Sequence, residues 1–202
     1  MSDPARSPRR RGDVVRRAVL AAAADEVAAG GIEAASVAAI AARAGVHETS
    51  IYRRWKTREN LLVDALLDRS AQAIPIPDTG SIRTDLITLV RLLSSYLGSP
   101  LGTALLRAGV LAVDDRYAHA RQVFWDTRRA ALLVVIDRAI NRGELLPGTD
   151  ARLTLEALLA PLHLRILLTG EPLDDTLPEQ LTDLVLNGIS QPSITDKAIP
   201  LS

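Results

Sequence analysis

The sequence predicts an all-α fold with about nine helices. Apolar residues recur at spacings of three and four along most of the chain, which is the period of a helix with one buried face. Most glycines and prolines fall between these stretches, where they end one helix before the next begins. No segment alternates apolar and polar residues between turn dipeptides, as paired strands would. We therefore expect helices packed on helices and no sheet.

The composition is that of a folded protein without covalent cross-links. The chain has 202 residues, of which 48% are hydrophobic and none is cysteine. Disulfides, thiolate zinc sites and a cysteine nucleophile are therefore excluded. The longest apolar runs, residues 18–24 and 130–136, are much shorter than the roughly 20 residues that span a bilayer. We predict no transmembrane helix and a cytoplasmic protein.

Positive charge is concentrated at the start of the chain. Residues 1–60 hold 11 basic and 7 acidic side chains, whereas the rest of the chain holds 13 and 17. Such asymmetry is typical of a nucleic-acid-binding part joined to a part with another task. Residues 1–12 are predicted to form a disordered basic arm with Arg6, Arg9, Arg10 and Arg11. This arm could follow a phosphate backbone, enter a minor groove, or remain a solvated tail.

Three short helices are predicted in residues 13–57. The first spans 13–29 and is ended by a pair of glycines. Ser36 can cap the second helix, and Gly45 stands where the left-handed residue of a tight turn would follow it. The third helix spans 48–55. Two short helices separated by a glycine-bearing turn are typical of a helix-turn-helix.

A longer helical half follows. Thr57 can cap a connecting helix over residues 58–74, and two prolines and a glycine then break the helical pattern. Residues 81–190 are predicted to form a second helical domain, and residues 191–202 a frayed tail. The helices expected in the second domain span 82–97, 101–113, 117–141, 151–168 and 177–189.

A sequence motif occupies Val19–Leu62. Its fixed points are Gly31, Ser36, Ile40, Ala41, Ala44, Gly45, Val46, Tyr52, Trp55, Arg58, Glu59, Asn60 and Leu61. In this order and spacing the motif resembles the DNA-binding domain of the tetracycline-repressor-like (TetR/AcrR) family of bacterial regulators. Three features depart from the family pattern: Val27 replaces the usual Phe, Arg58 replaces the usual Lys, and Ala38 and Ala39 stand where some members carry polar DNA-contacting residues. The first two replacements preserve the apolar core and the positive charge. The third leaves the second helix with fewer polar side chains that could contact DNA.

Residues 48–55 also have the properties of a recognition helix. Such a helix is short, exposes polar side chains at its N-terminal end to enter the major groove, and buries its opposite face. Ile51 and Trp55 are spaced to point inward, and the Ser36 hydroxyl can reach a phosphate from the start of the second helix. The candidate DNA-contacting residues are Ser36, His47, Glu48, Thr49, Ser50, Tyr52, Arg53, Arg54, Lys56 and Arg58.

Two of these residues have alternative roles. Arg53 could bind a phosphate or a guanine edge. Glu48 could accept a hydrogen bond from a cytosine amine, or it could favour the positive end of the helix dipole. The side chains expected to contact phosphates are those of Tyr52, Arg54, Lys56 and Arg58.

Residues 81–190 carry no catalytic signature. His47, His119 and His163 are not spaced to share a metal on a helix. The glycines do not fall in a nucleotide-binding spacing, and Ser94 and Ser95 do not lie in a nucleophile-elbow motif. We expect no enzymatic activity, no metal and no cofactor. The alternative is an all-α enzyme that uses His119 or His163.

The end of the second domain has two broad apolar helix faces. They exceed what one small core would bury, and two copies related by a two-fold axis would form a four-helix dimer interface. Pro161 is expected to kink the helix that carries it. The residues predicted at the interface are Leu155, Leu158, Leu159, Leu162, Ile166, Leu181 and Leu184.

The family resemblance implies a small-molecule pocket among the helices of residues 82–142. The side chains able to shape or anchor such a pocket are those of Tyr96, Arg107, Tyr117, His119, Phe124, Trp125 and Arg128. Ligand binding would shift the populations of two dimer geometries through helix 58–74, provided that the ligand binds one geometry better.

These observations lead to one main hypothesis. The chain is expected to be a ligand-responsive regulator of transcription that binds double-stranded DNA. The resemblance favours a homodimeric repressor that binds a palindromic operator and is released by a small, apolar effector of unknown identity, with activation left open. The alternative is a helical interaction protein that has lost sequence-specific DNA binding, which Ala38 and Ala39 favour.

Overall fold

The computed structural model describes residues 8–111 and 118–190. Within these ranges the chain forms nine α-helices, one π-helical turn and no strand, so the predicted all-α fold is confirmed. In chain order the elements are α1 (Pro8–Ala34), α2 (Val37–Ala44), α3 (Glu48–Trp55), α4 (Arg58–Ala73), α5 (Ile82–Leu97), α6 (Pro100–Leu111), α7 (Ala118–Asn141), α8 (Ala151–Leu164), the π-helical turn η2 (Arg165–Thr169) and α9 (Leu177–Ser190).

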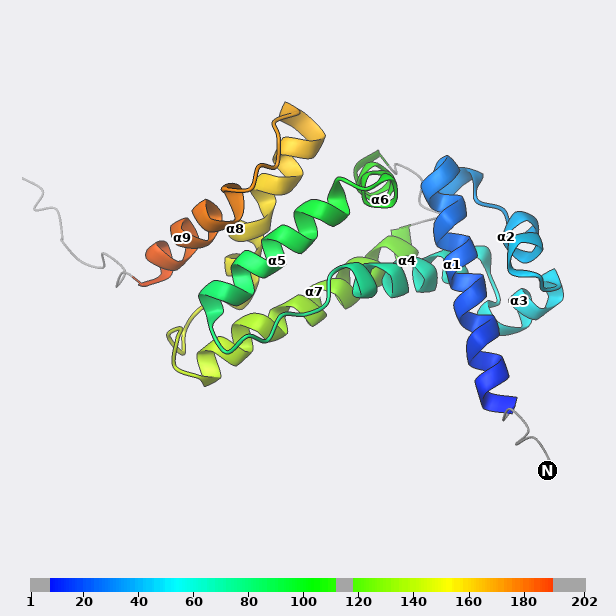
Figure 1. The fold of residues 1–202 in the computed structure, drawn as a ribbon, viewed down its shortest axis with the longest axis horizontal. Helices are drawn as coiled ribbons and strands as arrows, with labels where there is room; N and C mark the ends of the chain where they lie inside the picture. Colours follow the sequence, from blue (N-terminus) through cyan, green and yellow to red (C-terminus); the bar gives the residue numbers. More distant parts are fainter. Residues whose placement is uncertain (1–7, 112–117, 191–202) are drawn as a thin grey trace, which may run out of the picture.

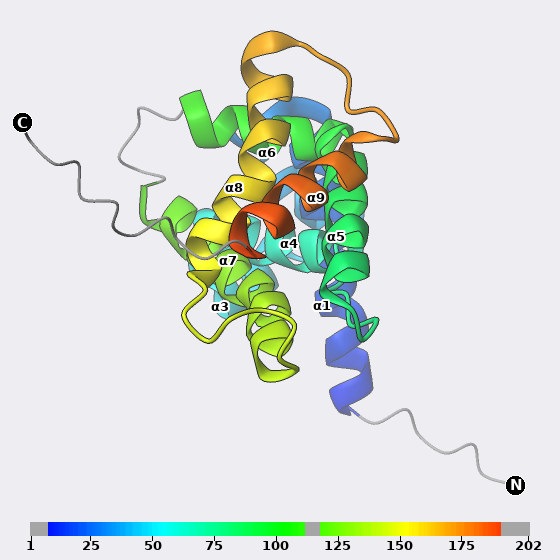
Figure 2. The ribbon, with the colours of Figure 1, turned by 90° about the vertical axis from the view of Figure 1, so that its left-hand side faces the viewer.

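The helices form two groups that α4 connects: the first is α1, α2 and α3, and the second is α5 to α9. Helices α1, α2 and α3 lie at one end of the molecule, and α8 and α9 lie at the other (Figure 1). Helix α4 packs against both α1 and α7, so it belongs to both groups. Helix α6 also packs on α1, which gives the second group a direct contact with the first. Figure 2 views the molecule from the α8–α9 end, where these two helices lie in front of the others.

Helix α1 is longer than the sequence predicts. It begins at Pro8 because proline fits the first turn of a helix, so residues 8–12 are helical and not part of a disordered arm. It continues past the glycine pair to Ala34, with a break at Gly31, whose φ of 81° and ψ of 173° favour glycine alone. Parts of the predicted arm and tail lie outside the described residues: Arg6, the side chains of Arg9, Arg10 and Arg11, and residues 191–202.

Helix α2 begins and ends as its sequence predicts. The Ser36 hydroxyl oxygen accepts a hydrogen bond from the Ala39 N–H at 3.1 Å, which caps the helix start. Gly45 adopts the left-handed conformation, with φ 65° and ψ 37°. The Val46 N–H then donates to the Ala41 carbonyl at 3.0 Å, so the last turn is closed by a Schellman motif. This turn sets the angle at which α3 leaves α2.

A polar cluster fixes the break between α4 and α5. The fully buried Asp85 accepts hydrogen bonds from the Thr79 N–H at 2.7 Å and from its hydroxyl at 2.8 Å. The Ile82 N–H donates to Glu144 at 2.7 Å. Arg142 pairs with Glu144 and lies 3.6 Å from Asp85. These bonds tie the start of α5 to the end of α7 and satisfy backbone groups that the helix start leaves unpaired.

Most of the predicted dimer face is buried inside the chain instead. Helix α8 packs against α5, α7 and α9 of the same molecule. The leucines that this packing buries, and that therefore belong to the core, are Leu155, Leu158, Leu162 and Leu181. Leu159 and Ile166 are half-buried, while Leu184 is 71% exposed. Periodicity reveals an apolar stripe but does not tell whether the same chain or a second one covers it.

Helix α8 continues through Pro161 and departs from α-helical geometry only later. After Leu164 the backbone widens into η2, which ends at the left-handed Gly170. Helix α8 and η2 together cover the helix predicted over residues 151–168. His163, on the last turn of α8, is half-buried, and its Nδ1 lies 2.9 Å from the Leu159 carbonyl oxygen.

Candidate nucleic-acid interface and effector cavity

Helix α3 (Glu48–Trp55) buries its apolar side and exposes its polar side. Ile51 and Trp55 are 1% and 7% exposed, as their spacing predicts. The exposed residues at its start and along its outer side are His47, Glu48, Thr49, Tyr52, Arg53 and Arg54, and Ser50 is half-buried. The Arg54 guanidinium also lies 5.5 Å from the centre of the Trp55 ring. The polar tip of the helix is therefore accessible to the groove of a duplex.

Trp55 links α3 to the helix that joins the two groups. Its indole Nε1 donates to the Asp64 carboxylate of α4 at 3.0 Å. The same carboxylate oxygen lies 3.5 Å from the Arg16 guanidinium of α1. One carboxylate thus holds the recognition helix, the connecting helix and α1 together. Neither Asp64 nor Arg16 is among the site residues predicted from the sequence.

A γ-turn connects α3 to α4. The Thr57 N–H donates to the Trp55 carbonyl at 2.8 Å across Lys56, whose φ is 68°. Lys56 is the single non-glycine residue with a positive φ in the described part of the chain. Its Nζ donates to the Arg53 carbonyl at 3.0 Å, so the ammonium group stays at the end of the recognition helix. Thr57 caps α4 as predicted, by accepting from the Asn60 N–H at 3.2 Å.

The Arg58 side chain is bonded to backbone carbonyls near the end of α1. Its Nε donates to the Ala35 carbonyl at 2.6 Å, and its Nη2 donates to the carbonyls of Ile32 and Glu33. The side chain is 20% exposed. The guanidinium therefore satisfies carbonyls at the end of α1 that have no helical partner. These bonds join α4 to the segment that follows the Gly31 break, and they leave fewer of the Arg58 N–H groups for the predicted phosphate contact.

Helix α2 offers one polar group at its start. The Ser36 hydroxyl is exposed, and as the cap it accepts a bond, so its own proton can be donated to a phosphate. Ala38 is exposed beside it and adds no polar group. Arg43, at the far end of α2, is bonded to Glu26 of α1 at 2.9 Å. Helix α2 is therefore mainly a support for α3.

A positively charged groove lies between α1 and α3. It has a volume of about 760 Å³, and no carboxylate is among the described residues that line it. Its polar lining comes from Arg16 of α1 and from His47, Ser50, Arg53 and Arg54 at or near α3. Arg16, Arg53 and Arg54 place three guanidinium groups on this concave surface, of which Arg16 is also paired with Asp64, and they match the charge of a phosphate backbone.

A second cavity, of about 510 Å³, lies where the two groups of helices meet. Residues of α1, α4, α5 and α6 line it, among them Ala28, Arg69, Leu92 and Tyr96. The cavity includes Tyr96, one of the residues predicted to shape a pocket among residues 82–142. It also has walls from α1 and α4, because α6 packs on α1 and brings the groups together.

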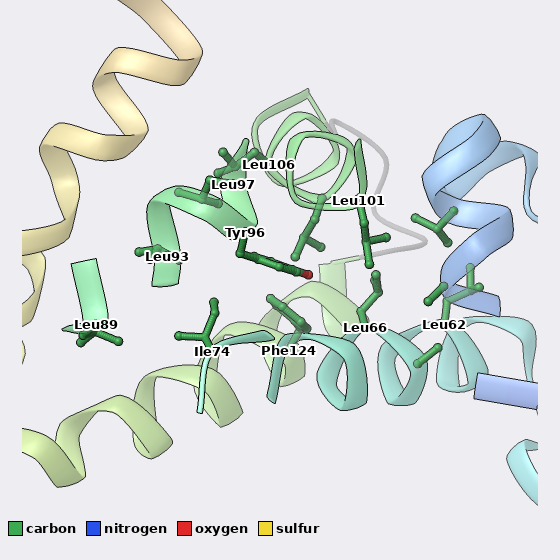
Figure 3. Packing of buried hydrophobic residues seen from close by; sticks show 14 of the residues in the cluster. Leu62, Leu66, Ile74, Leu89, Leu93, Tyr96, Leu97, Leu101, Leu106 and Phe124 are labelled. Carbon is green, nitrogen blue, oxygen red and sulfur yellow. The ribbon is translucent and has the colours of Figure 1, made fainter. Parts of the chain in front are cut away.

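The structure brings three of the predicted pocket residues together inside the second group. Tyr96 is 7% exposed, and its hydroxyl projects between Phe124, Leu66 and Leu101 (Figure 3). Burial raises the pKa of Tyr96, although the nearby Arg128 and Arg69 act to lower it. Burial lowers the pKa of Arg128.

The other predicted pocket residues are more scattered. Trp125 packs edge-on to Phe124, with ring centres 5.1 Å apart. His119 is exposed on α7. Tyr117 and the side chain of Arg107 lie outside the described residues.

Comparison with known proteins decides the family. Residues 19–65 match the family of bacterial regulatory proteins described as the tetR family, and residues 76–185 match the tetracyclin repressor-like C-terminal domain. The chain is 38% identical to the HTH-type transcriptional regulator AqdR of Rhodococcus erythropolis over 192 residues, which is 93% of each chain. The chain belongs to the TetR family.

Further relatives agree with this TetR-family membership. The chain is 32% identical to the DNA-binding transcriptional repressor TetR of Mycobacteroides abscessus, over 90% of this chain and 97% of the relative. The crystal structure of the TetR family transcription regulator SCO0332 has a TM-score of 0.75 and 27% identity, and the alignment covers 88% of this chain and 99% of that chain. As a TetR-family member, the chain is a DNA-binding, ligand-responsive transcriptional regulator.

Two other kinds of site are absent from the described residues of this TetR-family chain. In residues 8–111 and 118–190, no three metal-binding side chains come together. No helix in the same ranges is long and apolar enough to cross a membrane.

Proposed function

We propose that this TetR-family chain is a repressor that binds a palindromic operator as a homodimer and is released by a small-molecule effector. Its place of action is the cytoplasm, and it catalyses no reaction of its own. The exposed polar tip of α3, held on a buried base by Ile51 and Trp55, is the observation that carries the proposal. The printed description of the Mycobacteroides abscessus relative as a repressor supports the direction of control.

The proposed DNA contacts fall into two kinds, those to base edges and those to phosphates, according to where each side chain lies. Thr49 and Ser50, at the start of α3, are proposed to reach base edges together with His47. Phosphate contacts come from Arg16, Arg53 and Arg54, which border the α1–α3 groove, from Tyr52 and Lys56 on and after α3, and from Ser36 at the start of α2. Glu48 is assigned to the positive end of the α3 dipole, because it lies in the first turn.

The dimer is assigned to the outer face of α8 and its neighbour α9. Leu153, Leu164 and Leu168 are 62%, 50% and 79% exposed, and the exposed Ala157 and Ala160 lie between them at helical spacing. Leu184 of α9 adds a further exposed leucine. A continuous apolar face with small residues at its centre allows two helices to approach closely, and Figure 2 shows α8 and α9 at the free end of the molecule. Two α3 helices about 34 to 36 Å apart could then read two half-sites.

Binding-site selection on random duplex DNA with the full chain tests the function. The expected product is a palindrome that the chain retards in a gel-shift, with log affinity falling linearly against log salt by roughly 0.9 per phosphate contact. Thr49→Ala or Ser50→Ala should change the selected sequence, whereas Arg54→Ala should weaken binding to all sequences alike. Selection of no sequence, or a salt-independent affinity, would favour the helical interaction protein that has lost DNA binding.

A further inference from the structure

Two hydrogen-bond donors inside the second group have almost no partners. The Tyr96 hydroxyl is buried and has no hydrogen-bond partner in the described structure. The Arg128 side chain, on a residue 7% exposed, makes one long bond of 3.5 Å to the Ile74 carbonyl. A guanidinium has five N–H donors, so most of its capacity is unused here. Native proteins rarely bury a hydroxyl such as that of Tyr96 without a partner, because the group loses its hydrogen bonds to water and gains none in exchange.

The surroundings of the two donors are positively charged. Arg69 lies on the wall of the 510 Å³ cavity and, like Arg128, is close enough to Tyr96 to act on its ionisation. Of the described residues that line the cavity, Asp25 is the carboxylate, and it lies at the α1 wall within 3.8 Å of Arg43. Two arginines therefore act on the charge state of the phenol, and the carboxylate among the described lining residues is already paired with Arg43. Such a site attracts an anion.

The rest of the cavity wall is largely apolar. Ala28 of α1, Ala73 of α4, and Leu92 and Leu101 of α5 and α6 contribute to it. The volume of about 510 Å³ lies within the range of roughly 300 to 1,000 Å³ found for small-molecule sites. In Figure 3 the Tyr96 hydroxyl projects from α5 toward Leu101 of α6 and Leu66 of α4. Tyr96, Leu101 and Arg69 line the cavity, whereas Arg128 of α7 does not, so an anionic group reaches Arg128 only by moving side chains at the cavity wall.

We propose that the effector is an organic acid, with an apolar body in this cavity and an anionic oxygen that accepts from the Tyr96 hydroxyl and pairs with Arg128. This inference rests on the proposed function, in which a small molecule controls DNA binding. An occupant would contact α1 and α4 at the same time as α5 and α6. It would therefore favour one placement of the DNA-binding helices over another, which is what a change of operator affinity requires.

A matched pair of fluorescent dyes tests the assignment on the full chain. 8-Anilinonaphthalene-1-sulfonate carries an anionic group, and N-phenyl-1-naphthylamine has the same aromatic body without it. Arg128→Gln should weaken sulfonate dye binding by about tenfold and Tyr96→Phe by about fivefold, while both leave the neutral dye within about twofold. Arg128→Lys, which keeps the charge, should restore most of the affinity for the sulfonate dye. Circular dichroism establishes that each variant is folded.

Two control variants locate the bound dye. Arg129→Gln removes a neighbouring exposed guanidinium and should change neither dye. Ala73→Phe fills the cavity and should abolish binding of both dyes. The inference is overturned if the sulfonate dye does not bind, if Arg128→Gln and Tyr96→Phe weaken both dyes equally or neither, or if Ala73→Phe leaves dye binding intact.

The same proteins in a gel-shift with the selected operator separate the two proposals. If the operator is bound but the dye results fail, the effector class is wrong and the regulator assignment stands. If the dye results hold but no operator is bound by the wild-type chain, the anion site stands and the proposed function fails.

Discussion

The indole nitrogen of Trp55 donates to the carboxylate of Asp64 at 3.0 Å, so the buried end of the recognition helix is bonded directly to the connecting helix. Arg16 of α1 lies 3.5 Å from the same oxygen. A displacement of α4 by an effector would therefore move α3 through a hydrogen bond as well as through packing. The pair lies at the junction between the DNA-binding helices and the ligand-binding half.

Trp55→Phe should weaken DNA binding through the position of α3, since Phe keeps the ring in the core but removes the N–H donor. The loss of one partly buried hydrogen bond should cost about 1 kcal/mol of unfolding free energy. Operator affinity should fall while the salt slope is unchanged, because no phosphate contact is removed. Asp68→Ala, on α4 one turn after Asp64, is the control because it removes a bond to Gln72 alone. An equal loss of affinity in both variants would contradict the positioning role.

Arg58→Ala and Lys56→Ala should affect different properties, although both remove a cation near the DNA. Arg58 satisfies carbonyls at the end of α1, so its loss should cost about 1.5 to 3 kcal/mol of unfolding free energy and leave the salt slope unchanged. Lys56 is exposed, so its loss should reduce the salt slope by about one with little effect on stability. Urea unfolding and gel-shifts over a salt series measure both. The assignment is wrong if Arg58→Ala lowers the slope at wild-type stability.

Lys56→Gly should be more stable than Lys56→Ala. Both variants lose the ammonium group. Glycine adopts a φ of 68° without strain, whereas a residue with a Cβ atom at this position of the γ-turn has a backbone strain energy of about 1 to 3 kcal/mol. Part of that difference is offset by the greater freedom of glycine in the unfolded chain. We expect the Gly variant to exceed the Ala variant by about 1 kcal/mol in urea unfolding. Equal stabilities would mean that the turn is unstrained.

Sequence periodicity was sufficient for the helices and for the helix-turn-helix. The Ser36 cap, the left-handed Gly45 and the inward face of Ile51 and Trp55 depend on local chemistry, and the structure confirms each of them. The predicted start of α1 failed because arginines next to Pro8 resemble a disordered tail, although they are also good helix formers. Local sequence signals therefore predict which segments form helices better than they predict the first and last residues of each helix.

The parts of the site that depend on long-range contacts were not predicted. The sequence around Arg58 does not distinguish a phosphate-binding cation from one bonded within the protein. The carbonyls that accept from Arg58 lie more than 20 residues earlier in the chain, so their approach depends on how α4 packs on α1. The pairing of Asp64 with Trp55 likewise depends on how α4 crosses α3. The cavity was placed in the second domain alone because the packing of α6 on α1 has no signature in sequence.

Acid should weaken the polar cluster that joins the start of α5 to the end of α7. The Ile82 N–H, together with Arg142, holds the pKa of Glu144 below its ordinary value. The ionised carboxyl therefore adds stability that is present in full above the unfolded pKa of about 4.3 and is lost as the pH falls through the lower folded value. Glu144→Gln should be less stable than wild type at neutral pH, with the difference disappearing toward acid in thermal melts. Glu156→Gln, which breaks an exposed pair with Arg152, should follow wild type at every pH.

Leu164→Arg should convert the proposed dimer into monomers. Leu164 is 50% exposed on the outer face of α8, between Ala160 and Leu168, where a second copy would bring the same residues against it. A guanidinium buried there without a partner should weaken association by more than about tenfold, as measured by sedimentation equilibrium. Operator binding should fall with it, because a single α3 reads only one half-site. Val14→Arg is the matched control, since Val14 is 57% exposed on α1 at the opposite end, and it should remain dimeric. If Leu164→Arg remains dimeric at the concentration where wild type does, the interface lies elsewhere.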